Sequence, residues 1–412
     1  MNLKQRYPIK VLFAVIGIIL TSQVGVPLAG LACSNPANWQ STRLVQLEGA
    51  MAGVTAVSWA PPDPINPTNV QIATGSDDGW VRIYNITGLE FLDPSQELQV
   101  GSVGSCRIKA VAWSPDRTRI AIGTWNPNST AVTCEPQGSK LVIWTPATNA
   151  TVVGYEPGGG VNGLAWSPDS RFLTSTVQPP VPTADYKIRI WDTQNMGQSP
   201  TLSTDYYCQP MTGIAWSSDG LTIASAGTAC GPFGGSGSCR GTVMLSPGRQ
   251  VILWNGNINP PSCRAWLGPL HNVSLISVAF SPKADLVAAG SAEGLPQYDP
   301  SKIDIYNVAT GAFIPPSLAG HTGTVSSVDW CPDASLLASA GYSDLGTDKT
   351  IRIWNTATHQ QIPPTITGDT GNYGVYSVAW SPDGQLLASG SSDGKGKIWG
   401  VFGSLNPLRR LR

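Results

Sequence analysis

Acid–base side chains are scarce in this sequence of 412 residues. Asp, Glu, Lys and Arg make up 12% of it, about half the usual share in globular domains, and there are 3 histidines. The sequence contains no strand-to-helix nucleophile elbow, no HExxH helix and no GxxxxGK phosphate loop. We therefore expect no enzyme, no catalytic residue, no metal site and no cofactor.

The apolar run near the N-terminus, residues 11–20, is also short. Ten residues are few for crossing a membrane but suit the core of a signal peptide. Lys4, Arg6 and Lys10 precede the run, and small residues follow it up to Ala32. We therefore expect residues 1–32 to be a signal peptide and the protein to be exported to the periplasm, cell envelope or medium.

Three fates of this segment stay open. Gly30-Leu31-Ala32-Cys33 resembles a loose bacterial lipobox, which implies lipidation of Cys33, although the residues at −3 and −2 depart from the preferred Leu and small residue. The alternatives are plain cleavage before Cys33 and an uncleaved anchor. Contact with a membrane is expected only through such a lipid or anchor.

The charge balance indicates no nucleic-acid partner. The formal net charge is −1, and removal of residues 1–32 would make it −4. A weakly acidic body offers no basic surface to phosphates. Residues 403–412 hold three arginines and are expected to be a flexible basic tail.

Gly, Pro and Trp are abundant, and one pattern of strands and turns recurs seven times. Each repeat has a strand ending in an aromatic residue, a turn of Ser-Pro-Asp type, a Leu-Ala-Ser-like strand and a third strand ending in Trp or Tyr. The first aromatic positions are Trp59, Trp113, Trp166, Trp216, Phe280, Trp330 and Trp380, and the second are Tyr84, Trp144, Trp191, Trp254, Tyr306, Trp354 and Trp399.

The last repeat, VYSVAWSPDGQLLASGSSDGKGKIW at 375–399, resembles the WD-repeat (WD40) family, and the resemblance covers about 43–401. It implies an all-β fold, a seven-bladed β-propeller of four-stranded antiparallel blades at 43–402, preceded by a linker at 33–42. We expect an exported, bacterial-type member. The strand-like residues 43–47 match the fourth strand that the last repeat lacks, so they are expected to close the ring as an outer strand.

The resemblance also assigns structural roles. In repeat six it implies a hydrogen-bonded tetrad of His321, Ser339, Asp348 and Trp354. Repeats that have lost the His or the Asp are expected to depend more on packing or on disulfides. The aspartates of the Ser-Pro-Asp turns are expected to be hairpin residues, because Asp side chains bond the backbone ahead of them.

Insertions in repeats two to six fall between the second and third strands, which in WD propellers open on the top face. Long loops on a rigid scaffold commonly carry binding sites. The aromatic residues expected to form this top rim as a group are Trp125, Tyr206, Tyr207, Phe233, Tyr298, Tyr342 and Tyr373.

Eight cysteines in an exported chain predict disulfides. Cys106 is expected to pair with Cys134, and Cys230 with Cys239, with Cys208 as a rival partner of either. Cys331 replaces the serine of a Ser-Pro-Asp turn and is expected to be a buried free thiol. Cys263 has no assigned partner.

The function favoured by these observations is a non-catalytic scaffold that binds a protein or peptide on the top face, in an extracytoplasmic complex. One alternative is a receptor for a carbohydrate or small ligand that uses the aromatic rim. Another is a permanent structural subunit of a larger assembly.

Overall fold

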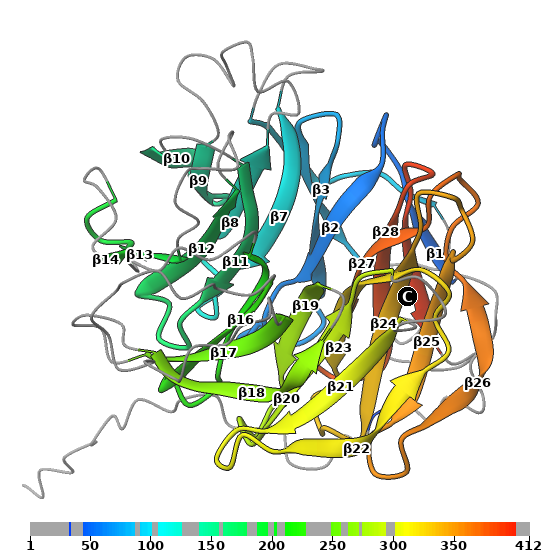
Figure 1. Cartoon of the computed structure of the whole chain (residues 1–412). Helices are drawn as coiled ribbons and strands as arrows, with labels where there is room; N and C mark the ends of the chain where they lie inside the picture. Colours follow the sequence, from blue (N-terminus) through cyan, green and yellow to red (C-terminus); the bar gives the residue numbers. More distant parts are fainter. Residues whose placement is uncertain are drawn as a thin grey trace, which may run out of the picture.

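The computed structural model describes the chain at residues 33, 44–86, 91–100, 106–125, 140–155, 160–178, 188–196, 202–203, 211–227, 249–256, 263–271, 274–293 and 301–400. Every regular element in this part is a β-strand, and the strands form seven sheets, antiparallel apart from one short parallel pair, arranged as blades around an axis (Figure 1). The predicted seven-bladed propeller is confirmed.

The blades hold four strands each, apart from the last. Blade 1 contains β2 (Val54–Trp59), β3 (Gln71–Ser76), β4 (Trp80–Asn85) and β6 (Gln96–Gln99); blade 2 contains β7 (Arg107–Trp113), β8 (Ile120–Trp125), β9 (Lys140–Thr145) and β10 (Ala150–Tyr155). Blade 3 contains β11 (Gly160–Trp166), β12 (Phe172–Gln178), β13 (Ile188–Asp192) and β14 (Leu202–Ser203); blade 4 contains β15 (Met211–Trp216), β16 (Thr222–Gly227), β17 (Arg249–Asn255) and β18 (Cys263–His271). Blade 5 contains β19 (Leu275–Phe280), β20 (Leu286–Ser291), β21 (Lys302–Asn307) and β22 (Phe313–Ala319); blade 6 contains β23 (Thr324–Trp330), β24 (Leu336–Tyr342), β25 (Thr350–Asn355) and β26 (Gln360–Thr367).

Blade 7 is closed by a strand from the other end of the chain. It contains β27 (Val375–Trp380), β28 (Leu386–Ser391) and β29 (Gly396–Gly400), and β1 (Val45–Leu47) pairs antiparallel with β29 (Figure 1). The expected outer strand is therefore confirmed. The short strand β5 (Phe91–Leu92) adds to β1 in parallel, so the connection within blade 1 extends the last blade to five strands.

Neighbouring blades pack closely because the second strands carry small residues. A Cβ on Gly75 of β3 would lie 2.4 Å from Cγ2 of Ile108 in blade 2, and one on Gly290 of β20 would lie 2.6 Å from Cγ1 of Val325 in blade 6. Gly123 and Gly390 face the next blade in the same way. The space is filled by β-branched side chains of the following first strand, which gives the dense interior typical of proteins.

Three of the tryptophans that end the first strands join one blade to the previous one through the indole nitrogen. The indole Nε1 of Trp59 donates to the carbonyl of Ala379 at 2.9 Å, and that of Trp166 donates to Ala112 at 3.0 Å. Trp330 makes the same bond to Ala279. A buried indole N–H needs such an acceptor, so these residues serve the closure of the ring.

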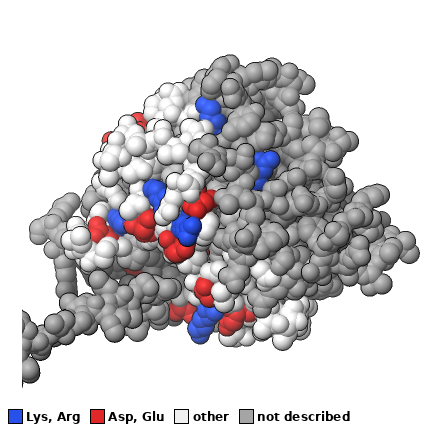
Figure 2. All heavy atoms as spheres, turned by 90° about the vertical axis from the view of Figure 1, so that its left-hand side faces the viewer, with Lys and Arg blue, Asp and Glu red and all other residues white. Residues whose placement is uncertain are grey.

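Two further observations concern membrane-spanning helices and the distribution of surface charge. Among the described residues, no helix is long and apolar enough to cross a membrane. On the face shown in Figure 2, several of the described Lys and Arg side chains lie beside Asp and Glu side chains.

Candidate functional site

The structure brings the four residues of the expected tetrad together in blade 6. Nδ1 of His321 lies 2.8 Å from Oδ2 of Asp348, and Nε2 lies 2.7 Å from Oγ of Ser339. The indole of Trp354 donates to the same Oγ at 2.8 Å. Burial lowers the pKa of His321. Burial alone would raise the pKa of Asp348, but hydrogen bonds from His321 and Thr350 hold it well below its usual value. The tetrad is a buried structural network.

Blades 1 and 7 lack the His and use a buried cation instead. Arg82 on β4 contacts Asp78 with 2.9 Å between Nη2 and Oδ2, and Lys397 on β29 contacts Asp393 with 2.5 Å between Nζ and Oδ2. All four side chains are at least 94% buried. The expectation of packing or disulfides in such blades missed these ion pairs, because a Lys or Arg in an exposed-looking alternating strand gives no sign of burial.

Residues 390–394 read Gly-Ser-Ser-Asp-Gly, which matches the spacing of a GxSxG elbow. In the structure they link strand β28 to strand β29, whereas an elbow leads from a strand into a helix. Ser391 donates to Asp393 at 2.6 Å and Ser392 donates to Asp369 at 2.7 Å. These hydroxyls are therefore parts of the turn and carry no sign of a nucleophile.

A group of apolar and aromatic side chains lies on the top face, the face that carries the turns between second and third strands. Tyr342 ends β24, Tyr373 precedes β27 and Tyr376 lies within β27. The ring centroid of Tyr342 is 6.5 Å from that of Tyr373 and 5.3 Å from that of Tyr376. Leu345 is 83% exposed and Met51 is 92% exposed in adjoining loops. We call these five residues the top patch.

The hydroxyls of Tyr342 and Tyr376 in the top patch stay protonated at neutral pH. Burial raises the pKa of Tyr376 to about 12, and the negative charges of Asp77 and Asp369 add to the effect. Burial also raises the pKa of Tyr342, whose hydroxyl donates to Asp344. The patch can therefore offer uncharged aromatic surface and hydrogen bonds together.

Charged residues of blades 1 and 2 continue the top face beyond Tyr376. Nη1 of Arg107 lies 3.8 Å from Oδ2 of Asp77, and Nζ of Lys109 lies 5.0 Å from the ring centroid of Trp125. Burial raises the pKa of Asp77 and lowers that of Lys109. The opposite charge of each residue partly offsets the effect of burial on the other. Lys109 and Tyr376 also line a cavity of about 220 Å³ on the propeller axis, to which all seven blades contribute.

The expected top rim is only partly described. Tyr342 and Tyr373 contact each other, whereas Trp125 lies on blade 2. Both Trp125 and Tyr342 are the last residues of their strands. Tyr206, Tyr207, Phe233 and Tyr298 lie outside the described residues. Sequence reasoning missed Met51, Leu345 and Tyr376. Leu345 lies in the expected insertion of repeat six but is not aromatic, and neither an insertion nor the aromatic rim marks Met51 or Tyr376.

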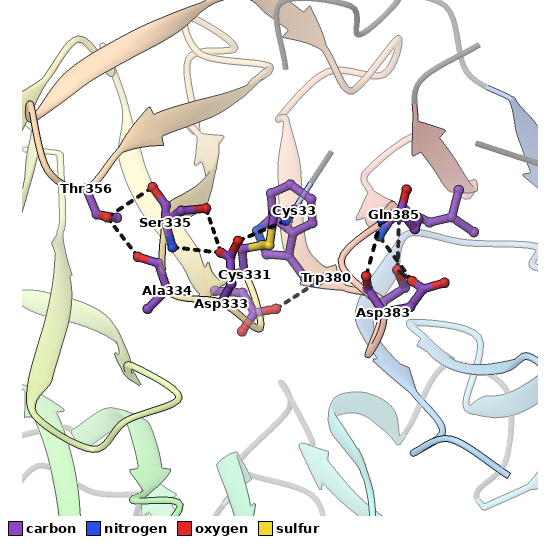
Figure 3. Close-up of a disulfide and its surroundings, with 12 residues drawn as sticks. Cys33, Cys331, Asp333, Ala334, Ser335, Thr356, Trp380, Asp383 and Gln385 are labelled. Carbon is purple, nitrogen blue, oxygen red and sulfur yellow. Dashed lines mark hydrogen bonds between the residues drawn. A yellow bond between two sulfur atoms is a disulfide. The ribbon is translucent and has the colours of Figure 1, made fainter. Parts of the chain in front are cut away.

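The cysteines differ from expectation at two positions. Cys331 forms a disulfide with Cys33, so the prediction of a free thiol is wrong, although Cys331 is buried as expected (Figure 3). The bond leaves Cys33 no thiol for a lipid thioether, so lipidation of Cys33 is incompatible with this structure. The backbone N–H of Cys33 also donates to Asp333 at 2.9 Å. The first residue of the expected linker is thus attached to the base of blade 6.

The disulfide partners of the remaining cysteines are only partly described. Cys106 takes part in a disulfide, but Cys134, its expected partner, lies outside the described residues, as do Cys208, Cys230 and Cys239. Cys33, Cys331 and Asp333 form the one cluster of metal-ligand residue types found in the described part. Because its two sulfur atoms are bonded to each other, it offers no thiolate to a metal.

Comparisons with known proteins agree with this architecture. A family model described as WD domain, G-beta repeat matches residues 41–85, 149–192, 315–355 and 361–400. Periodic tryptophan protein 2 of Arabidopsis thaliana is 24% identical over 69% of this chain and 27% of its own length. Cell division cycle 20.1, cofactor of APC complex, of the same plant is 25% identical over 72% of this chain and 54% of its own length. WD repeat-containing protein slp1 of Schizosaccharomyces pombe is 25% identical over 44% of this chain and 32% of its own length.

The matched part of this chain spans between about a quarter and a half of these three relatives. The relatives are plant and fungal proteins and give no support to the expected bacterial-type, exported member. Four repeats match the family model, and all seven blades share one topology. The chain belongs to the WD40-repeat family.

Proposed function

We propose that the protein is a non-catalytic scaffold that binds a protein or peptide partner through the top patch. The observation that carries this proposal is the contact of three tyrosines from two blades beside the exposed Met51 and Leu345. Grouped exposed apolar side chains on a soluble fold commonly mark interaction sites. The WD40 relatives, one of them named as a cofactor of a complex, are in keeping with such a role.

The chemistry of the top patch favours a partner with apolar side chains and exposed backbone groups. Tyrosine supplies contact area at low entropic cost together with a hydroxyl that can donate or accept. Arg107 and Asp77 at the edge add charges of both signs, which would orient the partner more than they would strengthen binding.

The double replacement Tyr373→Ala/Leu345→Ala is expected to weaken partner binding at least about tenfold, since truncation of central aromatic residues commonly costs more than 1 kcal/mol. Partner recovered from native extracts would be identified by mass spectrometry and its affinity measured by calorimetry. Leu221→Ala is the matched control, because Leu221 is 55% exposed in a turn between first and second strands. Undiminished affinity of the double variant would contradict the proposal, and selective binding of glycans would favour the receptor alternative.

We also propose that the protein functions outside the cytoplasm. The Cys33–Cys331 disulfide and the oxidised Cys106 support this location, because disulfides persist in oxidising compartments. Residues 1–32, with their basic start and short apolar run, would direct export. Because the sulfur of Cys33 is bonded to Cys331, it is not available for lipidation. We therefore propose cleavage before Cys33 or an uncleaved anchor.

Mass analysis of a non-reduced digest of the natively expressed protein is expected to contain a peptide pair joined through Cys33 and Cys331. If cleavage occurs, the first peptide begins at Cys33, and its α-ammonium replaces the N–H that now faces Asp333. A Cys33 peptide carrying fatty acid, or free thiols at both positions in the purified protein, would contradict this proposal.

A further inference from the structure

A cavity lies at the end of the axial channel opposite the top patch. Its volume is about 590 Å³, within the range of small-molecule sites. Blades 6, 7, 1 and 2 line it where their first strands end, and it lies at the same end as the Cys33–Cys331 disulfide (Figure 3). We call it the bottom cavity.

The walls of the bottom cavity are largely apolar. They include the edges of Trp59, Trp113 and Trp380, three side chains that are more than nine-tenths buried. Pro61, Pro62, Pro115 and Pro382 form its outer part. Ser58, Ser327 and Ser377 supply hydroxyl groups, and each accepts a backbone N–H group of the next blade.

Asp329 is the one ionisable residue that lines the bottom cavity. Its Oδ2 accepts the backbone N–H of Trp380 at 2.7 Å. Burial raises its pKa to about 7, opposed by the backbone N–H groups of Trp380 and Trp330 and by no cationic side chain. A carboxylate in such a place is unfavourable unless something positive compensates it.

The fold itself does not require this carboxyl group. The residue before the first-strand aromatic is alanine in five of the other blades, at Ala112, Ala165, Ala215, Ala279 and Ala379. In blade 1 the neutral Ser58 makes the equivalent bond, accepting the backbone N–H of Trp113 at 3.1 Å. A hydroxyl or a methyl group therefore suffices for closure, and blade 6 carries a negative charge that closure does not use.

We propose that the bottom cavity binds a small organic ammonium compound, whose cation pairs with Asp329 while its apolar body packs against the tryptophan edges and prolines. The charge of the ligand supplies the counter-ion that the protein lacks at this place. A bare metal ion fits less well, because one carboxylate and scattered hydroxyls do not form the oxygen shell that hard cations take. Binding here is independent of the top patch.

The test compares phenethylammonium chloride with its neutral analogue 2-phenylethanol, by calorimetry and tryptophan fluorescence on the full chain at pH 8. The ammonium compound is expected to bind at least tenfold more tightly than the alcohol. Asp329→Asn keeps an oxygen acceptor for the N–H of Trp380 and should fold, and it is expected to abolish this preference. Tyr373→Ala is expected to leave both affinities unchanged.

Proton linkage provides a second readout. Because no other ionisable side chain lines the cavity, binding of the ammonium compound should release a proton from Asp329 near pH 7 and strengthen from pH 6 to pH 8. The proposal is overturned if the ammonium compound does not bind at millimolar concentration, if it binds no better than the alcohol, or if Asp329→Asn keeps the preference.

Discussion

Replacing Asp393 with alanine is expected to lower the free energy of unfolding by about 3–5 kcal/mol, because it removes one partner of a buried ion pair. Lys397 would keep the carbonyl of Gly368 and Oγ of Ser391 as acceptors, at 2.7 and 3.2 Å, but would lose the carboxylate that contacts it directly. Burial already lowers the pKa of Lys397 in the intact protein. Urea denaturation followed by tryptophan fluorescence measures the loss.

The loss should depend on pH in a defined direction. Burial alone would raise the pKa of Asp393, but hydrogen bonds from Lys397 and Ser391 outweigh it and lower the pKa from 3.8 to about 2. A depressed carboxyl pKa stabilises the folded state above the unfolded pKa, and this stabilisation disappears as the pH falls through the folded pKa. The difference between wild type and Asp393→Ala should therefore be full at pH 7 and shrink between about pH 4 and pH 2.

Two controls separate the buried charge from general damage. Asp393→Ala/Lys397→Met removes both charges and is expected to recover most of the lost stability. Arg171→Ala breaks a pair with Asp192 in which the arginine is 51% exposed, and should cost about 0–1 kcal/mol. Equal losses for Asp393→Ala and Arg171→Ala would refute a special role of the buried pair.

The double replacement Cys33→Ser/Cys331→Ser is expected to destabilise the folded protein by about 3–5 kcal/mol. The bond joins residues 298 positions apart, and a cross-link over so long a loop restricts the unfolded chain strongly. Serine is a fitting replacement at 331, because Ser114, Ser167 and Ser381 occupy the same turn position in other blades. The turn should persist, so the change isolates the disulfide.

Chemical denaturation with and without reductant provides the measurement. Reductant should lower the stability of the wild type more than that of the variant, and the excess should equal the effect of the double replacement. Reduction of the bond that involves Cys106 affects both proteins alike. If the variant unfolds at the same denaturant concentration as the wild type, the prediction is wrong. The pairing of β1 with β29 would then be sufficient to keep the ring closed.

Much of the fold follows from patterns within single repeats. The aromatic ends of the strands, the Ser-Pro-Asp turns and the missing fourth strand of the last repeat are local features, and they predict seven blades closed by residues 43–47. The members of the tetrad lie within one blade, so His321 and Trp354 could be assigned from their places in repeat six.

The contacts between distant segments could not be foreseen in this way. Cys331 looked like a variant turn serine, because its partner Cys33 lies before the first blade. Tyr376 looks like any other residue of strand β27, and only the packing of blade 7 on blade 6 brings it to Tyr342. Met51 and Leu345 are ordinary loop residues until the loops of blades 6, 7 and 1 adjoin.

Local sequence thus determined the strands, the turns and the number of blades, because hydrophobic alternation and turn chemistry act over a few residues. The tertiary structure alone decided where charge and cysteine are used. The position of Asp329 is Ala in most other repeats, and that of Cys331 is Ser in several. Asp393 occupies an ordinary turn position between two strands. Packing of the blades places Asp329 on the wall of the bottom cavity, burial within blade 7 sets Asp393 against Lys397, and the segment before the first blade brings Cys33 to Cys331. Burial gives Asp329 and Asp393 their roles, and contact between distant segments gives Cys331 its role. Neither can be read from the sequence of a single repeat.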